Sequence, residues 1–85
     1  MDEEKKQIDA RIATRTVKEY FHEQSGPMGV LFFKVESVRP NSQEGVYYVR
    51  CGFYSNPGAN KPSRYEVKVN INTGNIINVE ELKDE

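Results

Sequence analysis

Apolar side chains recur with a helical period in the first third of the chain. No proline or glycine interrupts this stretch, and its apolar positions fall within about 100° of one another on a helical wheel. We therefore expect a helix over about residues 8–25, with Asp2 or Asp9 as its N-cap and with Gly26 and Pro27 at its end. The residues expected to face the core are Ala10, Ala13, Val17, Tyr20 and Phe21.

The remaining sides of this helix carry charged residues and two further isoleucines. Ile8 and Ile12 lie off the core stripe, so we expect them to cover a shoulder of the core or to touch a partner. The row expected opposite the stripe is basic and consists of Arg11, Arg15, Lys18 and His22.

After Pro27 the apolar period changes from 3.6 to 2, which is typical of antiparallel strands with one buried and one wet face. Strands are expected over about residues 29–38, 45–54, 64–72 and 75–82, separated by turns and one longer loop. The residues expected to point inward are Leu31, Phe33 and Val35, then Tyr47, Val49, Cys51 and Phe53, then Tyr65, Val67, Val69 and Ile71, and finally Ile77 and Val79.

The short connections between the strand segments favour antiparallel pairing of neighbours, because parallel pairs need longer crossovers. We expect a two-layer α+β domain in which one N-terminal helix packs on a four-stranded antiparallel meander sheet. The 85 residues are expected to form a single domain, 1–85, with one modest core. Its charged ends, residues 1–6 and 83–85, are expected to be flexible.

The hairpin from Tyr65 to Val79 pairs a Tyr-x-Val-x-Val strand with a Thr-Gly-x-Ile turn, and it resembles the C-terminal hairpin of PepSY-type domains. Residues 25–82 are also similar to the accessory protein O family of gas vesicles, through the helix, two strands, a proline-bearing loop and a Tyr-Glu-Val strand. Both resemblances imply a small fold of cystatin-like or related type and no catalytic residue. Asn70 stands where PepSY-type strands usually carry an acidic residue.

Composition and charge narrow the function classes. With 12 basic and 13 acidic residues the net charge is −1, which argues against non-specific nucleic-acid binding through a basic face. No apolar run approaches the roughly 20 residues that span a bilayer, and the N-terminal sequence lacks the pattern of a signal peptide. Because Cys51 is the only cysteine, no intrachain disulfide can form. We expect a cytoplasmic protein without membrane association.

Candidate residues for catalysis or metal binding are few. His22 is the only histidine and has no His/Cys cluster around it in the sequence, and Cys51 is expected to be a buried thiol. Glu36 and Glu66 are expected on the outer sheet face, where they pair across strands with Lys34, Arg50 or Lys68. We therefore expect no enzymatic activity, no catalytic residue, no metal site and no cofactor.

Two features are not explained by folding alone. The loop over residues 55–63 is longer than most hairpin connections, and it is either a mobile surface loop or a recognition loop. The outer sheet face mixes aromatic and basic residues, which is typical of protein interfaces and of surfaces that stack nucleic-acid bases. The candidate interaction surface consists of Phe32, Lys34, Tyr48, Arg50, Tyr54, Lys61, Arg64 and Lys68.

These observations favour a small non-enzymatic domain that acts through protein–protein contact, as an interaction or regulatory module. The expected partner is an unidentified protein or a second copy in a weak homodimer. One alternative is single-stranded nucleic-acid binding on the aromatic and basic outer face. A further alternative is a small-ligand site between helix and sheet.

Overall fold

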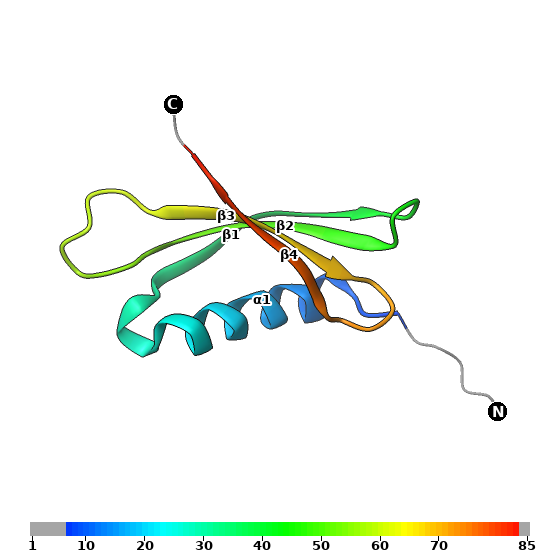
Figure 1. Cartoon of the computed structure of the whole chain (residues 1–85), viewed down its shortest axis with the longest axis horizontal. Helices are drawn as coiled ribbons and strands as arrows, with labels where there is room; N and C mark the ends of the chain where they lie inside the picture. Colours follow the sequence, from blue (N-terminus) through cyan, green and yellow to red (C-terminus); the bar gives the residue numbers. More distant parts are fainter. Residues whose placement is uncertain (1–6, 84–85) are drawn as a thin grey trace.

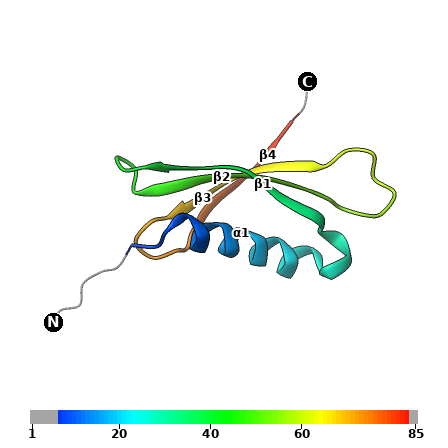
Figure 2. The same cartoon turned by 180° about the vertical axis from the view of Figure 1, so that it is seen from behind.

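The protein folds as one helix packed on one sheet, and a computed structural model describes residues 7–83. The four strands pair antiparallel in chain order, so the expected α+β meander is confirmed. The helix lies across one face of the sheet, and no described helix covers the other face (Figures 1 and 2). The elements are α1 (Ala10–Ser25), a 3₁₀ turn η1 (Pro27–Gly29), β1 (Leu31–Asn41), β2 (Val46–Tyr54), β3 (Ser63–Asn70) and β4 (Ile76–Leu82).

Both ends of α1 are fixed by residues that the sequence singles out. The carboxylate of Asp9 accepts a hydrogen bond of 3.0 Å from the backbone N–H of Ile12, which makes Asp9 the N-cap. At the other end Gly26 takes a φ of 78° and donates its N–H to the carbonyl of His22 at 2.8 Å. The other proposed cap, Asp2, lies outside the described residues, as do the expected flexible ends, residues 1–6 and 83–85, except for Lys83.

Residue Ile8 precedes the helix rather than beginning it. Its N–H donates to the carbonyl of Ile71 at 2.8 Å, and the hydroxyl of Tyr47 donates to its carbonyl at 3.4 Å. These bonds hold the backbone of Ile8 against the sheet, so the helix starts two residues later than expected. Its side chain packs against the core, which agrees with the expectation that Ile8 covers a shoulder of the core. Ala10 is exposed instead of buried and lines a hollow on the outer side of α1.

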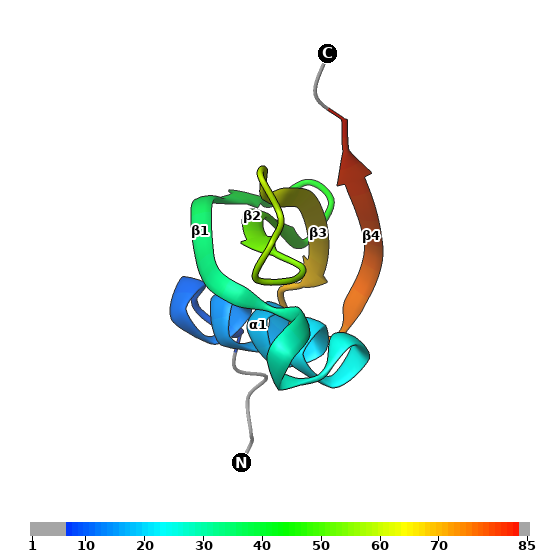
Figure 3. The same ribbon diagram turned by 90° about the vertical axis from the view of Figure 1, so that its left-hand side faces the viewer.

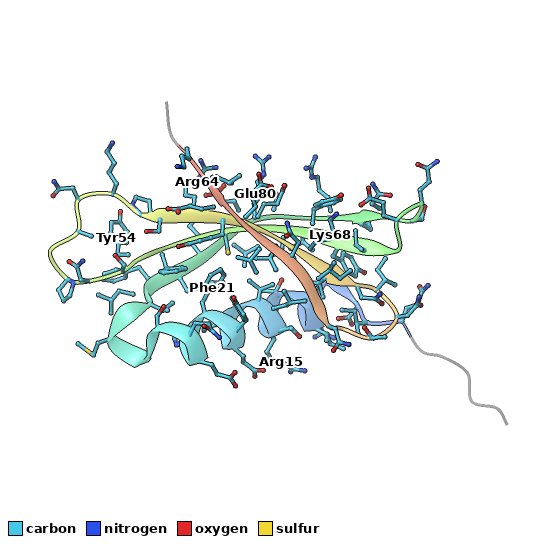
Figure 4. The ribbon with its side chains drawn as sticks, in the orientation of Figure 1. Arg15, Phe21, Tyr54, Arg64, Lys68 and Glu80 are labelled. Carbon is cyan, nitrogen blue, oxygen red and sulfur yellow. The ribbon has the colours of Figure 1, made fainter. Side chains whose placement is uncertain are left out.

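The core fills the space between α1 and the inward face of the sheet. Phe21 points from the helix into this space (Figure 4), and its ring lies 5.0 Å from Phe53 and 4.8 Å from Tyr65 between centroids. The inward faces expected for the first three strands agree with the burial of their side chains, except at Leu31. This residue pairs with the outward Tyr54 and lines a hollow beside it, because the bulge between Leu31 and Lys34 shifts the alternation. The buried cluster consists of Ala13, Val17, Phe21, Val30, Val49, Cys51, Phe53, Val67 and Val69.

The fourth strand departs from the expected alternation. Lys68 pairs with Asn78 but Val69 pairs with Ile76, so β4 carries one extra residue at this point. Because such a bulge restarts the alternation, Ile77 is 52% exposed and the expectation that it points inward is wrong. The inward residues of β4 are Ile76 and Val79.

The first strand carries two bulges, between Leu31 and Lys34 and between Val35 and Ser37. It also runs three residues beyond its expected end at residue 38, because Val38–Asn41 continue the pairing with β2. Both bulges lie on an edge strand, where an extra residue disturbs only one neighbour.

The sheet is longer than the helix that covers it. The molecule measures 52 × 28 × 16 Å, whereas a helix of 16 residues spans about 24 Å. The hairpin loop between β2 and β3 therefore extends past the C-terminal end of α1 (Figure 1). The sheet is strongly twisted, and the C-terminal end of β4 extends away from α1 (Figure 3). Within residues 7–83 no helix has the length and apolar character needed to cross a bilayer.

The register of β3 predicts very different costs for the same substitution at two adjacent positions. Val69 is fully buried, whereas Lys68 lies on the outer face. Val69→Asn should lower the free energy of unfolding by about 3 kcal/mol or more, because it removes apolar burial and leaves a buried amide without partners. Lys68→Asn should cost under about 1 kcal/mol. Chemical denaturation of both variants measures the difference, and equal losses would contradict this register.

Candidate interaction surface

The outward-facing candidate residues form two separate groups rather than one patch. Phe32 and Tyr54 lie together beside the β2–β3 loop, and we name this region the aromatic end. Tyr48 is six residues from Tyr54 along β2, which places the two about 20 Å apart. The third aromatic of the expected surface therefore cannot contact the same small ligand or side chain as the first two. The aromatic end consists of Leu31, Phe32, Tyr54, Asn56, Pro57, Ala59 and Pro62.

The aromatic end is a ridge between two hollows. The rings of Phe32 and Tyr54 meet edge to face with centroids 6.1 Å apart. A hollow of about 140 Å³ lies between this ridge and the loop residues Asn56, Pro57 and Ala59. A second hollow of about 210 Å³ lies on the other side, where Lys34, Glu36 and Pro62 are among its walls.

Local hydrogen bonds shape the loop that borders the ridge. The side-chain oxygen of Asn56 accepts a hydrogen bond of 2.9 Å from the N–H of Gly58. The backbone carbonyl of Asn56 accepts a second hydrogen bond, of 3.1 Å, from the N–H of Ala59. This is a turn of the kind that asparagine favours. The turn places Pro57 and Ala59 beside Tyr54 in the wall of the smaller hollow.

Phe32 has an unusual backbone conformation. It is the one non-glycine residue with positive φ among those described, at 57°, and it lies in the first bulge of β1. A bulky side chain in the left-handed region costs about 1–2 kcal/mol. Burial does not compensate for this cost, because 82% of the side chain is exposed. The fold therefore holds a strained residue whose ring points into solvent, a combination that is common at functional sites.

The strain at Phe32 can be measured with a matched pair of substitutions. Phe32→Gly and Phe32→Ala both remove the ring, but only glycine accepts a φ of 57° without steric cost. The relief of about 1–2 kcal/mol exceeds the entropic cost of glycine, about 0.5–1 kcal/mol. We expect Phe32→Gly to unfold at higher denaturant concentration than Phe32→Ala, by about 0.5–1 kcal/mol in stability. If the alanine variant were the more stable, Phe32 would not be strained.

An ion pair crosses the sheet next to the aromatic end. Arg64 on β3 donates from Nε and Nη2 to the two carboxylate oxygens of Glu36 on β1, each at 2.8 Å. The pair spans β2 at Gly52, where a Cβ atom would come within 3.4 Å of the Arg64 side chain. Glycine at this outward position leaves room for the arginine. These hydrogen bonds lower the pKa of Glu36 below its ordinary value, against the smaller opposing effect of burial.

The other predicted cations of β2 and β3 are also paired with carboxylates. Glu66 lies 3.1 Å from Nε of Arg50, directly across the strand pair, and 3.9 Å from Arg39. Arg50 is one of the three cations expected as partners of Glu36 and Glu66, whereas Glu36 pairs with Arg64, which is not among them. Among the predicted surface residues, Arg50 and Arg64 are therefore neutralised by neighbouring side chains.

A third carboxylate–cation group lies around Tyr48. The Nζ of Lys68 is 3.8 Å from Glu44 and 5.5 Å from the centre of the Tyr48 ring. The Tyr48 hydroxyl donates to Glu44, and this bond raises the pKa of the hydroxyl. The Tyr48 side chain is thus held by contacts with Glu44 and Lys68 on the same sheet face, whereas the ring of Phe32 is exposed.

The two remaining predicted lysines lie at the margins. Lys34 borders the larger hollow of the aromatic end. Lys61 lies at the end of the β2–β3 loop, where it lines a hollow of about 420 Å³ with Arg64, Glu81 and Lys83. Neither lysine forms an ion pair with a residue in the described part of the chain.

The residues whose side chains could take part in catalysis or bind a metal lie away from this surface. Cys51 is fully buried, and this burial, together with the charge of Glu36, raises the pKa of its thiol to about 12. The side chain of His22 is half-buried, and its Nε2 has no hydrogen-bond partner among residues 7–83. Among residues 7–83 no group of three or more His, Cys, Asp or Glu side chains could hold a metal ion.

The chain was compared with protein-family models, with curated proteins and with solved structures, and none of them matches. The sequence pattern alone misses two features of this surface, the carboxylate of Glu44 beside Tyr48 and the pairing of Glu36 with Arg64. A signal for the second does exist, because Gly52 interrupts a strand of large side chains at an outward position. What distinguishes the surface is therefore the aromatic end beside a neutralised ion-pair network.

The ion pair between Arg64 and Glu36 leads to a prediction about the pKa of Glu36. Gly52→Val should push Arg64 away and raise the pKa of Glu36 toward its ordinary value, as Arg64→Gln should also do. Because the folded-state pKa is lowered, the pair stabilises the fold at neutral pH, and this contribution is lost as the pH falls through that pKa. An NMR titration of the Glu36 carboxylate in the three proteins measures the shifts. An unchanged pKa in Gly52→Val would mean that the glycine is not needed.

Proposed function

We propose that this chain is a small, non-enzymatic protein-interaction module that contacts its partner through the aromatic end. The observation that carries the proposal is Phe32, which is strained in its backbone, 82% exposed and braced edge to face by Tyr54. Folding alone favours neither the strain nor the exposure. A partner that covers the ring would supply the missing burial, because aromatic side chains are the main anchors of protein interfaces.

Protein contact is a better match for this surface than single-stranded nucleic acid. A strand of bases needs successive stacking platforms along a basic groove. Here Tyr48 is separated from the aromatic end and bonded to Glu44, while Arg50 and Arg64 are engaged by carboxylates. Phosphate groups would have to compete with those carboxylates for the same cations.

We further propose a cytoplasmic location and a distant similarity to PepSY-type or gas-vesicle accessory domains of cystatin-like type. The location is supported by Cys51, a free thiol that is compatible with a reducing compartment. The similarity is supported by the order of elements, one helix followed by a four-stranded meander.

Photo-crosslinking from the aromatic end tests the proposed contact. Phe32 is replaced by a benzoyl-phenylalanine analogue in cells, and the adducts formed on irradiation are identified by mass. We expect one dominant protein adduct from position 32 and from position 54. The same analogue at position 48 is the control, because Tyr48 lies on the same face but outside the aromatic end.

Competition by point variants makes the test specific. Unlabelled wild-type protein should suppress the adduct, and Phe32→Ser or Tyr54→Ser should suppress it far less. Tyr48→Ser should compete as well as the wild type. Equal crosslinking from positions 32 and 48, or equal competition by all variants, would overturn the assignment of the partner to the aromatic end.

A further inference from the structure

The two edges of the sheet differ in how well they are protected against pairing with another strand. An edge strand presents a row of unpaired backbone N–H and C=O groups, and bulges, proline and lysine are common means of blocking it. β1 carries all three, namely two bulges, Pro40 and the exposed Lys34. β4 is the other edge, and it contains neither proline nor lysine. The edge at β1 is therefore blocked, whereas the edge at β4 is open.

The open edge also exposes an aliphatic side chain. Ile77 is the extra residue of the bulge near the start of β4, and it is 52% exposed. From Asn78 to Leu82 the pairing with β3 is regular. No described element lies beyond β4 in the sheet (Figure 3). A strand added at this edge would continue the ladder and bring side chains beside Ile77.

The sequence of β4 is compatible with its own reverse. Two copies related by a two-fold axis pair their edge strands antiparallel around one central residue, because directly opposed side chains share a face. With Val79 at the centre, the pairing extends over the whole of β4. Each carboxylate then faces an uncharged residue, since Glu80 lies opposite Asn78 of the second copy and Glu81 lies opposite Ile77.

Other centres of pairing are less favourable. Centring on Glu80 or on Glu81 would place two carboxylates directly opposite each other, which is destabilising. Centring on Asn78 would leave the last two residues of β4 opposite the turn that precedes the strand. The strand thus specifies one register with itself, and this self-complementarity favours a second copy of the chain as the occupant of the edge.

We propose that two copies of this chain associate by antiparallel pairing of β4 with β4, centred on Val79, so that their sheets become continuous. The contact is isologous, because each copy contributes the same strand. A pair of seven-residue strands is smaller than a standard interface, so the dimer is weak, with a Kd of about 10 μM to about 1 mM. The aromatic end lies on β1, β2 and the loop after β2, and the dimer leaves it uncovered.

Two substitutions of one exposed residue test this register with the full-length chain. Asn78 lies opposite Lys68 within the chain and, in the proposed dimer, opposite Glu80 of the second copy. Asn78→Asp therefore gains an attraction within the chain and meets a repulsion across the dimer, and Asn78→Lys does the reverse. Denaturation at a protein concentration well below the Kd measures the fold alone. Because the two effects have opposite signs, a folding defect cannot imitate the expected change in association.

Sedimentation at protein concentrations from about 10 μM to about 1 mM measures the association. We expect Asn78→Asp to raise the Kd by about fivefold or more and Asn78→Lys to lower it by a similar factor, because the dimer contains the pair twice. At about 500 mM salt the three Kd values should converge. Phe32→Ser should dimerise like the wild type, which separates this contact from the aromatic end.

Disulfide trapping locates the centre of the pairing. Asn78 and Glu80 are exposed on the outer face, where Figure 4 shows Glu80 on the side away from α1. An equimolar mixture of Asn78→Cys and Glu80→Cys brings two Cα atoms to about 4.5–5.5 Å in the proposed register, within reach of a disulfide. Each variant alone separates its thiols by two further positions and should be trapped far less. The native Cys51 does not interfere, because it is fully buried.

Three results would overturn the proposal. The first is a wild type that stays monomeric up to about 1 mM, which would leave the open edge to a strand of another protein. The second is a dimer whose Kd is the same in Asn78→Asp and Asn78→Lys, which would place the contact elsewhere. The third is trapping of either cysteine variant alone as readily as the mixture, which would contradict a centre at Val79.

Discussion

The packing of α1 on the inward face of the sheet determines what every other surface can do. Val17 and Phe21 share one core with Val49, Val67 and Val69, and all of these side chains are almost completely buried. Since a slip of one residue would turn a whole strand over, this core fixes the register of the central strands. The outer face is thereby also fixed, because each buried residue has an outward neighbour. The same helix leaves its far side in solvent, with the basic row on it.

Within that constraint, the bulges of β1 determine the backbone conformation and the contacts of two residues that alternation already assigns to the outer face, Phe32 and Glu36. The first bulge of β1 holds Phe32 outward with positive φ, and the second brings Glu36 to the position from which it meets Arg64. Both occur on an edge strand, where a disturbed ladder affects one neighbour only. The features that distinguish the outer face thus arise where the backbone pairing is least regular.

The sequence predicts the regular part of this structure and little of the irregular part. The helix, its cap at Asp9 and the faces of β2 and β3 follow from period and capping chemistry, which are local properties. A bulge depends on how two strands pair, so the exposure of Ile77 and the strain at Phe32 are not visible in either strand alone. The separation of Tyr48 from Tyr54 follows from their spacing of six positions along the sequence. A prediction that considers only which face each residue occupies ignores this spacing.

The aromatic end lies where the sheet runs past the helix that covers it, and this position explains its exposure. The bulge in β1 gives Phe32 its positive φ, and the turn after β2 sets Pro57 and Ala59 beside Tyr54. None of these residues belongs to the core that α1 forms with the sheet. A substitution at the aromatic end therefore changes a binding surface without disturbing the packing on which the fold depends.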